Sequence, residues 1–314
     1  MDDTSTTGDG GTRVLAEGLR FPEGPVALAD GSVLVVEIAA ERLTRVAPDG
    51  SLDVVAEIPG GPNGAALGPD GWIWITNNGG CFSWHDLGGI LLPGAVPDTW
   101  RHGSIDRVHP ETGVVETVYT HSGGRPLLAP NDLVFDDHGG LWFTDFGLRR
   151  ERDALWGSIH YAAADGSSIH EVLHPLESPN GIGLSPAGDR LYVAETYTGR
   201  VYAWSVTAPG VAEGAGFLPP NGELLAGLPR LQLLDSLAVD GEGYVCVGTL
   251  QEGGITVISP DGASVEHVAL DDPLITNVAF GGPDLRTAYV TASSTGRLLA
   301  LDWPRDGLRL PYHP

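Results

Sequence analysis

The chain has 314 residues and a formal net charge of -24 at pH 7, from 41 acidic and 17 basic residues. This charge excludes a nucleic-acid-binding protein, because phosphate contacts require clustered positive side chains. All 17 basic residues are Arg, which excludes Schiff-base catalysis by Lys and a P-loop Lys.

Cys81 and Cys246 are the only cysteines. Two cysteines are too few for a disulfide framework, so we expect reduced thiols in a cytoplasmic protein. No run of about 18 apolar residues occurs, so no membrane span is expected. Residues 1–12 are polar and acidic without an apolar core, which predicts a disordered tail before a single domain over residues 13–314.

The first predicted strand, Val14 to Glu17, precedes a pattern that then recurs along the chain. In each copy a short apolar strand begins at an Asn or an acid, a tight turn rich in Gly, Pro and Asp follows, and a second strand returns. The copies begin at Pro22-Glu23-Gly24, Pro62-Asn63-Gly64, Pro130-Asn131-Asp132, Pro179-Asn180-Gly181, Leu234-Asp235-Ser236 and Thr276-Asn277-Val278.

Six strand-rich copies predict a repeat architecture. Strands of β-branched and aromatic residues closed by turns are typical of four-stranded blades, and six such blades around an axis form an all-β, six-bladed β-propeller. The unpartnered strand at Val14 to Glu17 is expected to pair with the blade that ends near Trp303, which closes the ring.

The second copy is interrupted by Gly79 to Gly103 before Ser104 to His109 resumes the blade. Long loops within compact domains are usually lids or binding loops, although a loop packed on its own aromatic residues is an equally good interpretation. If the segment is a lid, Trp84, His85 and Trp100 are expected to shape an apolar cover over the site.

The innermost strand of each blade lines the channel of a propeller, so the residue that opens each inner strand is expected at the channel mouth. An isolated Asn at a turn carries little information. Six oxygen-bearing side chains converging on one axis predict instead a site for a hard divalent cation, Ca²⁺ first. No His or Cys lies among them, which argues against zinc. The six residues are Glu23, Asn63, Asn131, Asn180, Asp235 and Asn277.

A second set of polar residues ends the returning strands and is expected one strand further from the axis, as support for the first set or as substrate contacts. Solvated strand ends are the alternative interpretation. These residues are Glu37, Asn77, Asp145, Glu195 and Thr249.

These motifs together resemble the gluconolactonase/regucalcin (senescence marker protein) family over nearly the whole chain, from about Val14 to Trp303. The resemblance rests on Phe21-Pro22-Glu23-Gly24-Pro25, Pro130-Asn131-Asp132-Leu133, Leu141 to Asp145, Pro179 to Ile182 and Leu234 to Asp240. It implies a six-bladed propeller with a divalent metal in its channel, often Ca²⁺, and in most members the opening of sugar lactones. Glu23, Asn180 and Asp235 match metal ligands of the family, and Asn131 matches a position that binds metal in some relatives and substrate in others.

The substrate side of the site departs from the family pattern. Ala129 stands where the regucalcin branch has an Arg, and Phe146 to Arg149 offers no counterpart of its acidic substrate residue. Asn277 stands where the related diisopropyl fluorophosphatase has a His. The metal site is therefore expected to transfer to this chain more completely than the substrate site.

The resulting hypothesis is a divalent-metal-dependent hydrolase of a lactone or related ester, in which Asp235 is the general base or the nucleophile. Its ligands would be Glu23, Asn131, Asn180 and Asp235. A small-molecule substrate would contact residues of both polar sets and of the interrupting segment, namely Asn63, Asn77, Trp84, His85, Asp145 and Asn277. Two alternatives stay open, a non-catalytic metal-stabilised binding propeller and an isomerase or lyase on the same scaffold. The sequence predicts no nucleic-acid or membrane partner and leaves the oligomeric state undefined.

Overall fold

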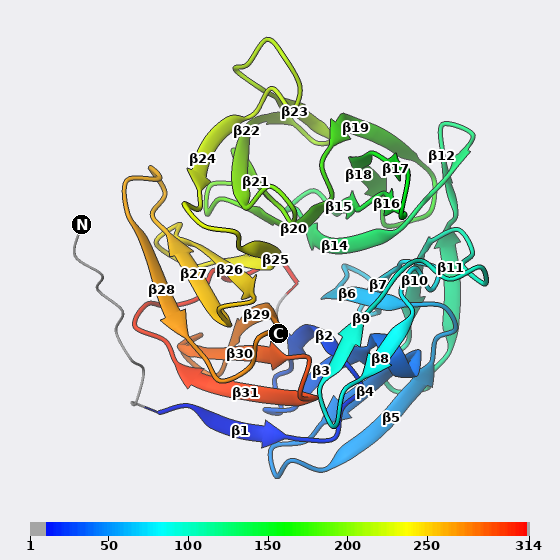
Figure 1. Cartoon of the computed structure of the whole chain (residues 1–314), viewed down its shortest axis with the longest axis vertical. Helices are drawn as coiled ribbons and strands as arrows, with labels where there is room; N and C mark the ends of the chain where they lie inside the picture. Colours follow the sequence, from blue (N-terminus) through cyan, green and yellow to red (C-terminus); the bar gives the residue numbers. More distant parts are fainter. Residues whose placement is uncertain (1–10, 313–314) are drawn as a thin grey trace.

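A computed structural model describes residues 11–312 of the chain. Six β-sheets are arranged as blades around a central axis, which confirms the predicted six-bladed propeller (Figure 1). Of the tail expected at residues 1–12, residues 1–10 lie outside the described part.

Each blade holds four strands that run outward from the axis. The first three blades, in that order, are β2 (Pro22–Ala27), β3 (Val33–Glu37), β4 (Arg42–Val46) and β5 (Leu52–Glu57); β6 (Pro62–Leu67), β7 (Ile73–Asn77), β10 (Ser104–Val108) and β11 (Val115–Tyr119); and β14 (Pro130–Phe135), β15 (Gly140–Asp145), β18 (Gly157–Ala163) and β19 (Ile169–Leu176).

The remaining blades follow the same plan, except that the fourth has an additional short strand and the sixth takes its outer strand from the start of the domain. They are β20 (Pro179–Leu184), β21 (Arg190–Glu195), β22 (Arg200–Ala208) and β24 (Glu223–Gly227); β25 (Leu233–Val239), β26 (Val245–Leu250), β27 (Gly254–Ile258) and β28 (Val265–Ala269); and β29 (Ile275–Gly281), β30 (Thr287–Ala292), β31 (Arg297–Asp302) and β1 (Arg13–Ala16). In the fourth blade a short strand, β23 (Val211–Glu213), also pairs with β22.

The ring is closed by the two ends of the chain, as the sequence predicted. Strand β1 pairs antiparallel with β31, so the sixth blade takes its outer strand from the start of the domain. Figure 1 shows the two strands side by side at one edge of the molecule. The inner strands also form a closed cycle, because β2 packs against β6 and the succession through β14, β20, β25 and β29 returns to β2.

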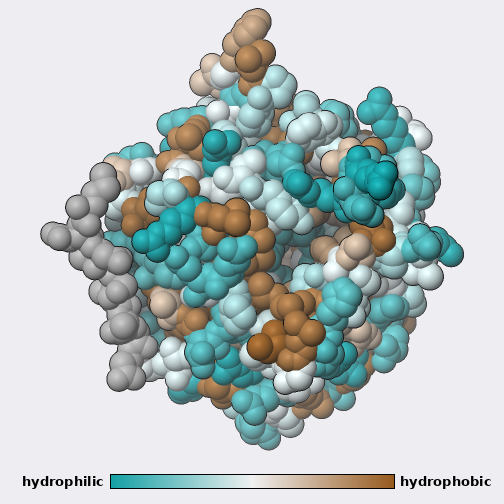
Figure 2. Space-filling view, viewed as in Figure 1, coloured by the Kyte–Doolittle hydropathy of each residue, from teal (hydrophilic) through white to brown (hydrophobic). Residues whose placement is uncertain are grey.

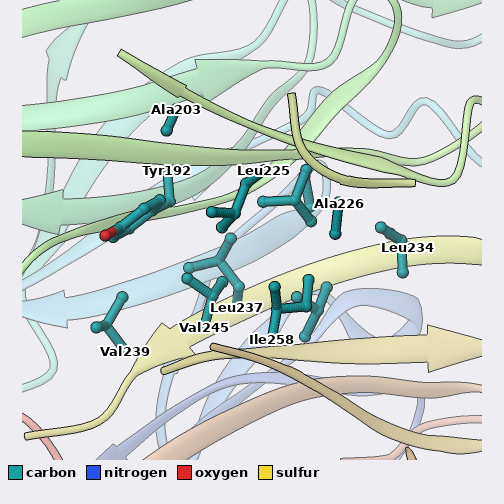
Figure 3. Close-up of a cluster of buried hydrophobic side chains, with 12 residues drawn as sticks. Tyr192, Ala203, Leu225, Ala226, Leu234, Leu237, Val239, Val245 and Ile258 are labelled. Carbon is teal, nitrogen blue, oxygen red and sulfur yellow. The ribbon is translucent and has the colours of Figure 1, made fainter. Parts of the chain in front are cut away.

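Apolar side chains fill the spaces between neighbouring blades. The second strands of the first three blades are buried throughout, which explains their continuous apolar runs, since each blade is covered on both faces. Figure 3 shows the cluster between the fourth and fifth blades, where Tyr192 and Ala203 face Leu237 and Val245. Leu234 of this cluster lies next to Asp235, so core packing fixes the backbone that carries this site residue.

The interrupting segment of the second blade folds into a hairpin of β8 (Trp84–Asp86) and β9 (Leu91–Pro93). Two smaller hairpins lie near the third blade. One, β12 (His121–Ser122) with β13 (Arg125–Pro126), precedes its inner strand, and the other, β16 (Leu148–Arg149) with β17 (Ala154–Leu155), connects its second and third strands. A short 3-10 helix, η1 (Ile38–Ala40), follows β3. Cys81 and Cys246 are buried and unpaired, as expected. Among residues 11–312, no helix has the length and apolar character needed to cross a bilayer.

Candidate metal centre and substrate mouth

Each inner strand carries a bulge next to its predicted site residue. The pairing of the inner strand with the second strand slips by extra residues in all six blades, for example between Glu23 and Val26 and between Leu234 and Leu237. A bulge takes residues out of the regular ladder and redirects their side chains. The bulges therefore explain how one short motif, repeated six times, presents polar side chains to the channel.

Close approach of the blades at this level requires glycine. Gly24 adopts φ +51°, and a Cβ there would lie 2.6 Å from the backbone N of Ala65 in the next blade. A Cβ on Gly181 would lie 2.6 Å from the backbone N of Leu237. The Gly that follows Glu23 and Asn180 thus allows the inner strands to converge around the axis.

Hydroxyl groups bond one blade to the next at the same level. The Thr144 hydroxyl donates to the backbone carbonyl of Asn180 at 2.7 Å, and the Thr76 hydroxyl donates to that of Asn131. The Ser293 hydroxyl donates to the carbonyl of Pro22 at 2.5 Å, across the junction of the last and first blades. These bonds fix the backbones of Asn131, of Asn180 and of Pro22, which precedes Glu23, against the neighbouring blades.

Glu23 is buried and only one of its carboxylate oxygens is bonded. Oε2 accepts hydrogen bonds from the Gly24 amide at 2.6 Å and from Asn277 Nδ2 at 2.7 Å. Oε1 is buried with no partner among the described residues, and Asn131 Oδ1 is in the same condition. A buried carboxylate oxygen or amide oxygen without a donor is costly, so these two atoms fit a bound cation.

Asn180 and Asp235 come from adjacent blades. The Ser236 hydroxyl donates to Asn180 Oδ1 at 3.3 Å, and Asn180 Nδ2 donates to the Thr196 hydroxyl at 3.2 Å. This pattern points the amide oxygen of Asn180 toward the segment that carries Asp235. Asn63 makes no side-chain hydrogen bond within residues 11–312, and Asn277 Oδ1 accepts from the amide of Val278, so the oxygen of Asn277 is already used.

A third carboxylate lies beside the two predicted ones. Asp132 is buried and accepts hydrogen bonds from the backbone amides of Leu133 at 2.9 Å and Ile182 at 3.2 Å. The sequence offered one indication of its role, because Asp132 occupies the position after the site residue where four other copies have Gly or Ser. The Asp132 side chain lines the channel cavity, whereas most Asp residues in the repeats lie in turns.

All three carboxyl groups have a raised pKa, chiefly because they are buried. Burial raises the pKa of Glu23 to about 7 against the hydrogen bonds from Asn277, Gly24 and Thr276. Burial and then the charge of Glu23 raise the pKa of Asp132 to about 8. Burial, Glu23 and Asp132 raise the pKa of Asp235 well above its ordinary value. Like charges held this close favour a protonated state or a bound cation.

The donor set fits an ion that prefers oxygen. Within residues 11–312 no group of three or more His, Cys, Asp and Glu side chains is arranged to hold a metal by itself. The predicted ligands supply two carboxylates and two amides, and amide oxygens are normal ligands of Ca²⁺. A site at Glu23, Asn131, Asn180 and Asp235 would therefore depend on the unbonded amide oxygen of Asn131 as much as on charge.

The second polar set has a repeated structural role. In four blades the last residue of the second strand accepts a backbone amide from the segment leading into the inner strand of the same blade. The amide donors are Arg20 to Glu37 at 2.7 Å, Gly61 to Asn77 at 2.9 Å, Ala129 to Asp145 at 2.8 Å and Glu177 to Glu195 at 2.9 Å. Thr249 bonds with the Thr256 hydroxyl at 2.7 Å. Asn77 and Asp145 thus use oxygens inside their own blades, and their substrate contacts remain predictions.

The β8–β9 hairpin lies along the mouth face in front of the first blade, and this face is hollowed near its middle (Figures 1 and 2). The Leu91 amide donates to the Ser294 carbonyl of the sixth blade at 2.8 Å, and Trp84 lies 4.9 Å from Phe21 between ring centroids. At the other end of the segment, Phe82 and Trp100 pack with an apolar cluster that includes Phe146 of the third blade. The segment therefore borders the mouth, and His85 is exposed on it.

Two cavities lie near the site, and only the smaller one is lined by inner-strand residues. A cleft of about 540 Å³ lies under the interrupting segment and is lined by Asn77, Trp84, Arg101 and His102 among others. A smaller cavity of about 110 Å³ lies within the channel, where apolar side chains surround Asp132 and Asn277. Leu308, Leu310 and Tyr312 also line this smaller cavity, so the last described residues cover the end of the channel opposite the mouth.

Comparison with known proteins agrees with this architecture. A family model described as the SMP-30/Gluconolactonase/LRE-like region matches residues 21–294. A gluconolactonase of Zymomonas mobilis is 24% identical over 310 residues, which cover 89% of this chain and 78% of that protein. A 6-deoxy-6-sulfogluconolactonase of Pseudomonas putida is 30% identical over 232 residues, which cover 73% of this chain and 74% of that protein.

The solved structures show the same fold at lower identity. A calcium-binding protein, regucalcin, from Agrobacterium tumefaciens superposes with a TM-score of 0.75 at 21% identity, over 97% of each chain. A gluconolactonase of Xanthomonas campestris superposes with a TM-score of 0.74 at 21% identity, over 95% of this chain and 91% of that one.

Proposed function

Because the chain belongs to the SMP-30/gluconolactonase/LRE-like family, we propose that it is a divalent-metal-dependent hydrolase of a lactone or a related ester. The matching relatives named as lactonases support hydrolysis of a lactone. The observation that carries the metal dependence is the pair of buried oxygens without partners, Glu23 Oε1 and Asn131 Oδ1, among carboxyl groups with raised pKa.

The ion would be held by Glu23, Asn131, Asn180 and Asp235, with Ca²⁺ the first choice and another divalent metal possible. Bound there, it would polarise the lactone carbonyl and stabilise the negative charge that develops on its oxygen. Asn277 would hold Glu23 in place through the 2.7 Å hydrogen bond to Oε2, which leaves Oε1 to face the ion.

Asp235 is the proposed base or nucleophile. As a base, it would take a proton from water as the water oxygen bonds to the carbonyl carbon, and the ring oxygen would leave and take up a proton to give a hydroxy acid. As a nucleophile, its own oxygen would bond to that carbon while the ring oxygen leaves and takes up a proton. Water would then add to the Asp235 carboxyl carbon of the acyl-enzyme and release the hydroxy acid. Single-turnover hydrolysis in ¹⁸O-water tests this second route, because water that adds to the Asp235 carboxyl carbon leaves label in Asp235, whereas the base route places all the label in the product.

The substrate would enter from the mouth face. Asn63 has an unbonded amide among the described residues, and Trp84 and the cleft border the mouth. Asn63, Asn77, Trp84, His85, Asp145 and Asn277 are the proposed contacts, and the apolar cover of the channel's far end would keep bulk water from the ion.

The test is hydrolysis of a lactone panel by the calcium-loaded protein, followed by proton release and by NMR of the product. We expect ring-opened hydroxy acids and a rate abolished by a chelator and restored by Ca²⁺. A chelator-resistant rate would contradict the metal dependence. Binding without turnover would favour the non-catalytic propeller, and a product isomeric with the substrate would favour an isomerase or lyase.

A further inference from the structure

An arginine and a tyrosine from neighbouring blades are stacked at the mouth face. Arg149 lies on β16, just after the second strand of the third blade, and Tyr197 lies in the turn after the second strand of the fourth. The guanidinium carbon of Arg149 is 4.2 Å from the centroid of the Tyr197 ring. Phe146 packs near the same ring at 6.1 Å between centroids. The plane of the guanidinium is therefore fixed by an aromatic surface.

Arg149 keeps donors free. Its Nη1 donates to Glu177 Oε1 at 2.7 Å, and within residues 11–312 Nε and Nη2 donate to no acceptor. The side chain is 48% exposed. Arg107 offers a contrast, because its guanidinium bonds to both Asp70 and Glu116. The guanidinium of Arg149 is thus held through Nη1, while its Nε and Nη2 donors stay available to a ligand.

The turn that carries Tyr197 is attached to two of the proposed metal ligands. The Thr196 hydroxyl accepts from Asn180 Nδ2 at 3.2 Å, and the Thr196 carbonyl accepts from the amide of Leu234, next to Asp235, at 3.4 Å. The Tyr197 hydroxyl makes no hydrogen bond to any described residue. Burial raises the pKa of Tyr197, with Arg149 opposing and the nearby groups Cys81, Asp235 and Glu177 adding to it. The stacked pair therefore lies at the mouth beside the proposed centre.

We propose that Arg149 and Tyr197 form a subsite that binds an anionic substituent of the substrate, such as a carboxylate, at a distance from the ring that is opened. This inference rests on the proposed hydrolase function. The chain carries a formal net charge of -24, so an anionic substrate needs a cation beside its path. A guanidinium with two adjacent free donors matches the geometry of a carboxylate, and the Tyr197 hydroxyl is a third free donor.

The decisive experiment compares two lactones that differ only in the substituent. D-glucaro-1,4-lactone carries a carboxylate where D-glucono-1,4-lactone carries a hydroxymethyl group. We expect the calcium-loaded protein to prefer the first, and Arg149→Gln to lower kcat/KM for it about tenfold or more while changing kcat/KM for the second less than about threefold. Arg149→Lys should fall between, because a point charge replaces the planar fork.

Two variants control for the fold and for charge. Arg152→Gln removes a guanidinium whose side chain is 90% exposed in the same hairpin, and it should leave the preference unchanged. Tyr197→Phe keeps the stacked ring and should retain most of the preference, whereas Tyr197→Ala should lose it.

Equal losses for both lactones in Arg149→Gln, an unchanged ratio, or a wild type that prefers the neutral lactone would overturn the subsite. If the wild type opens neither lactone, the proposed function is judged by the wider lactone panel and the subsite is judged by binding. Calorimetric titration of glucarate should show affinity weakened about tenfold in Arg149→Gln but not in Arg152→Gln. Identical glucarate affinities in the two variants would reject it.

Discussion

Asn277 Nδ2 donates a 2.7 Å hydrogen bond to Glu23 Oε2 between residues 254 positions apart in the chain. The bond joins the last inner strand to the first, so the same contact helps to close the ring and orients a proposed metal ligand. It also leaves Glu23 Oε1 as a buried carboxylate oxygen without a partner. We propose that this oxygen contacts the bound cation.

Glu23→Gln should weaken calcium binding at least about tenfold, because the site loses one of its charged ligands. Isothermal titration with CaCl₂ measures the effect. The matched control is Glu37→Gln in the same blade, where the carboxylate accepts from Arg42 Nε at 2.7 Å and from the Arg20 amide. That variant should lower the free energy of unfolding by about 2 to 3 kcal/mol and keep calcium affinity. If the two variants changed calcium affinity equally, Glu23 would not be a ligand of the ion.

Asp235→Asn should lower kcat for lactone hydrolysis by roughly 10² to 10⁴, since the amide can neither accept the proton nor attack the carbonyl. The fold should persist, because Asn retains an oxygen at the same place. Asp261→Asn, in an exposed turn of the same blade, serves as the control and should match the wild type. A fully active Asp235→Asn enzyme would assign the chemistry to another group.

The pH dependence of stability follows from the raised pKa values. In the metal-free protein Glu23 and Asp132, with pKa values raised to about 7 and about 8, stay protonated where the unfolded chain has already released those protons. The folded state then binds more protons than the unfolded state, so the free energy of unfolding should fall as pH rises from about 4 to about 8. Chemical denaturation across this range measures it.

Calcium should remove most of that pH dependence, because it offsets the charges that burial disfavours. The stabilisation by CaCl₂ should therefore be small at pH 5 and larger at pH 8. Asp132→Asn should flatten the metal-free curve by removing one buried acid. A calcium effect of the same size at both pH values would show that these carboxyl groups do not bind the ion.

The β8–β9 hairpin offers a test of the mouth. Gly94 donates its amide to the Ser83 carbonyl at 2.6 Å, so residues 84–93 can be replaced by Asn-Gly without moving the ends apart. We expect calcium affinity to be kept and KM to rise with little change in kcat, which is the pattern of lost substrate binding. Shortening the 214–221 loop at the rim of the fourth blade is the control. An unchanged KM in the first variant would show that the hairpin takes no part in substrate binding.

The sequence predicted the six blades because each copy contains its own turns and inner strand. Glu23, Asn131 and Asn180 could be found as copies of one motif. Asp132 was missed because its position depends on the hydrogen bond from the Ile182 amide in another blade, which a local sequence pattern cannot indicate. The hydroxyl bonds from Thr76 and Thr144 to neighbouring blades were missed for the same reason.

Contacts between distant parts of the chain also determine where the interrupting segment lies and which groups the second polar set bonds. The segment Gly79 to Gly103 has no repeat to align with, so its contact with Ser294 of the sixth blade was not predictable. The second polar set was placed correctly at the strand ends. Its partners were not predictable, because the backbone amides that Glu37 and Asp145 accept carry no side-chain signature.

The most direct test is a long-wavelength anomalous difference map from crystals grown with CaCl₂. We predict one strong peak in the channel, about 2.3 to 2.6 Å from Glu23 Oε1, Asn131 Oδ1, Asn180 Oδ1 and a carboxylate oxygen of Asp235. A channel without a peak, in crystals of protein that hydrolyses lactones, would contradict the account.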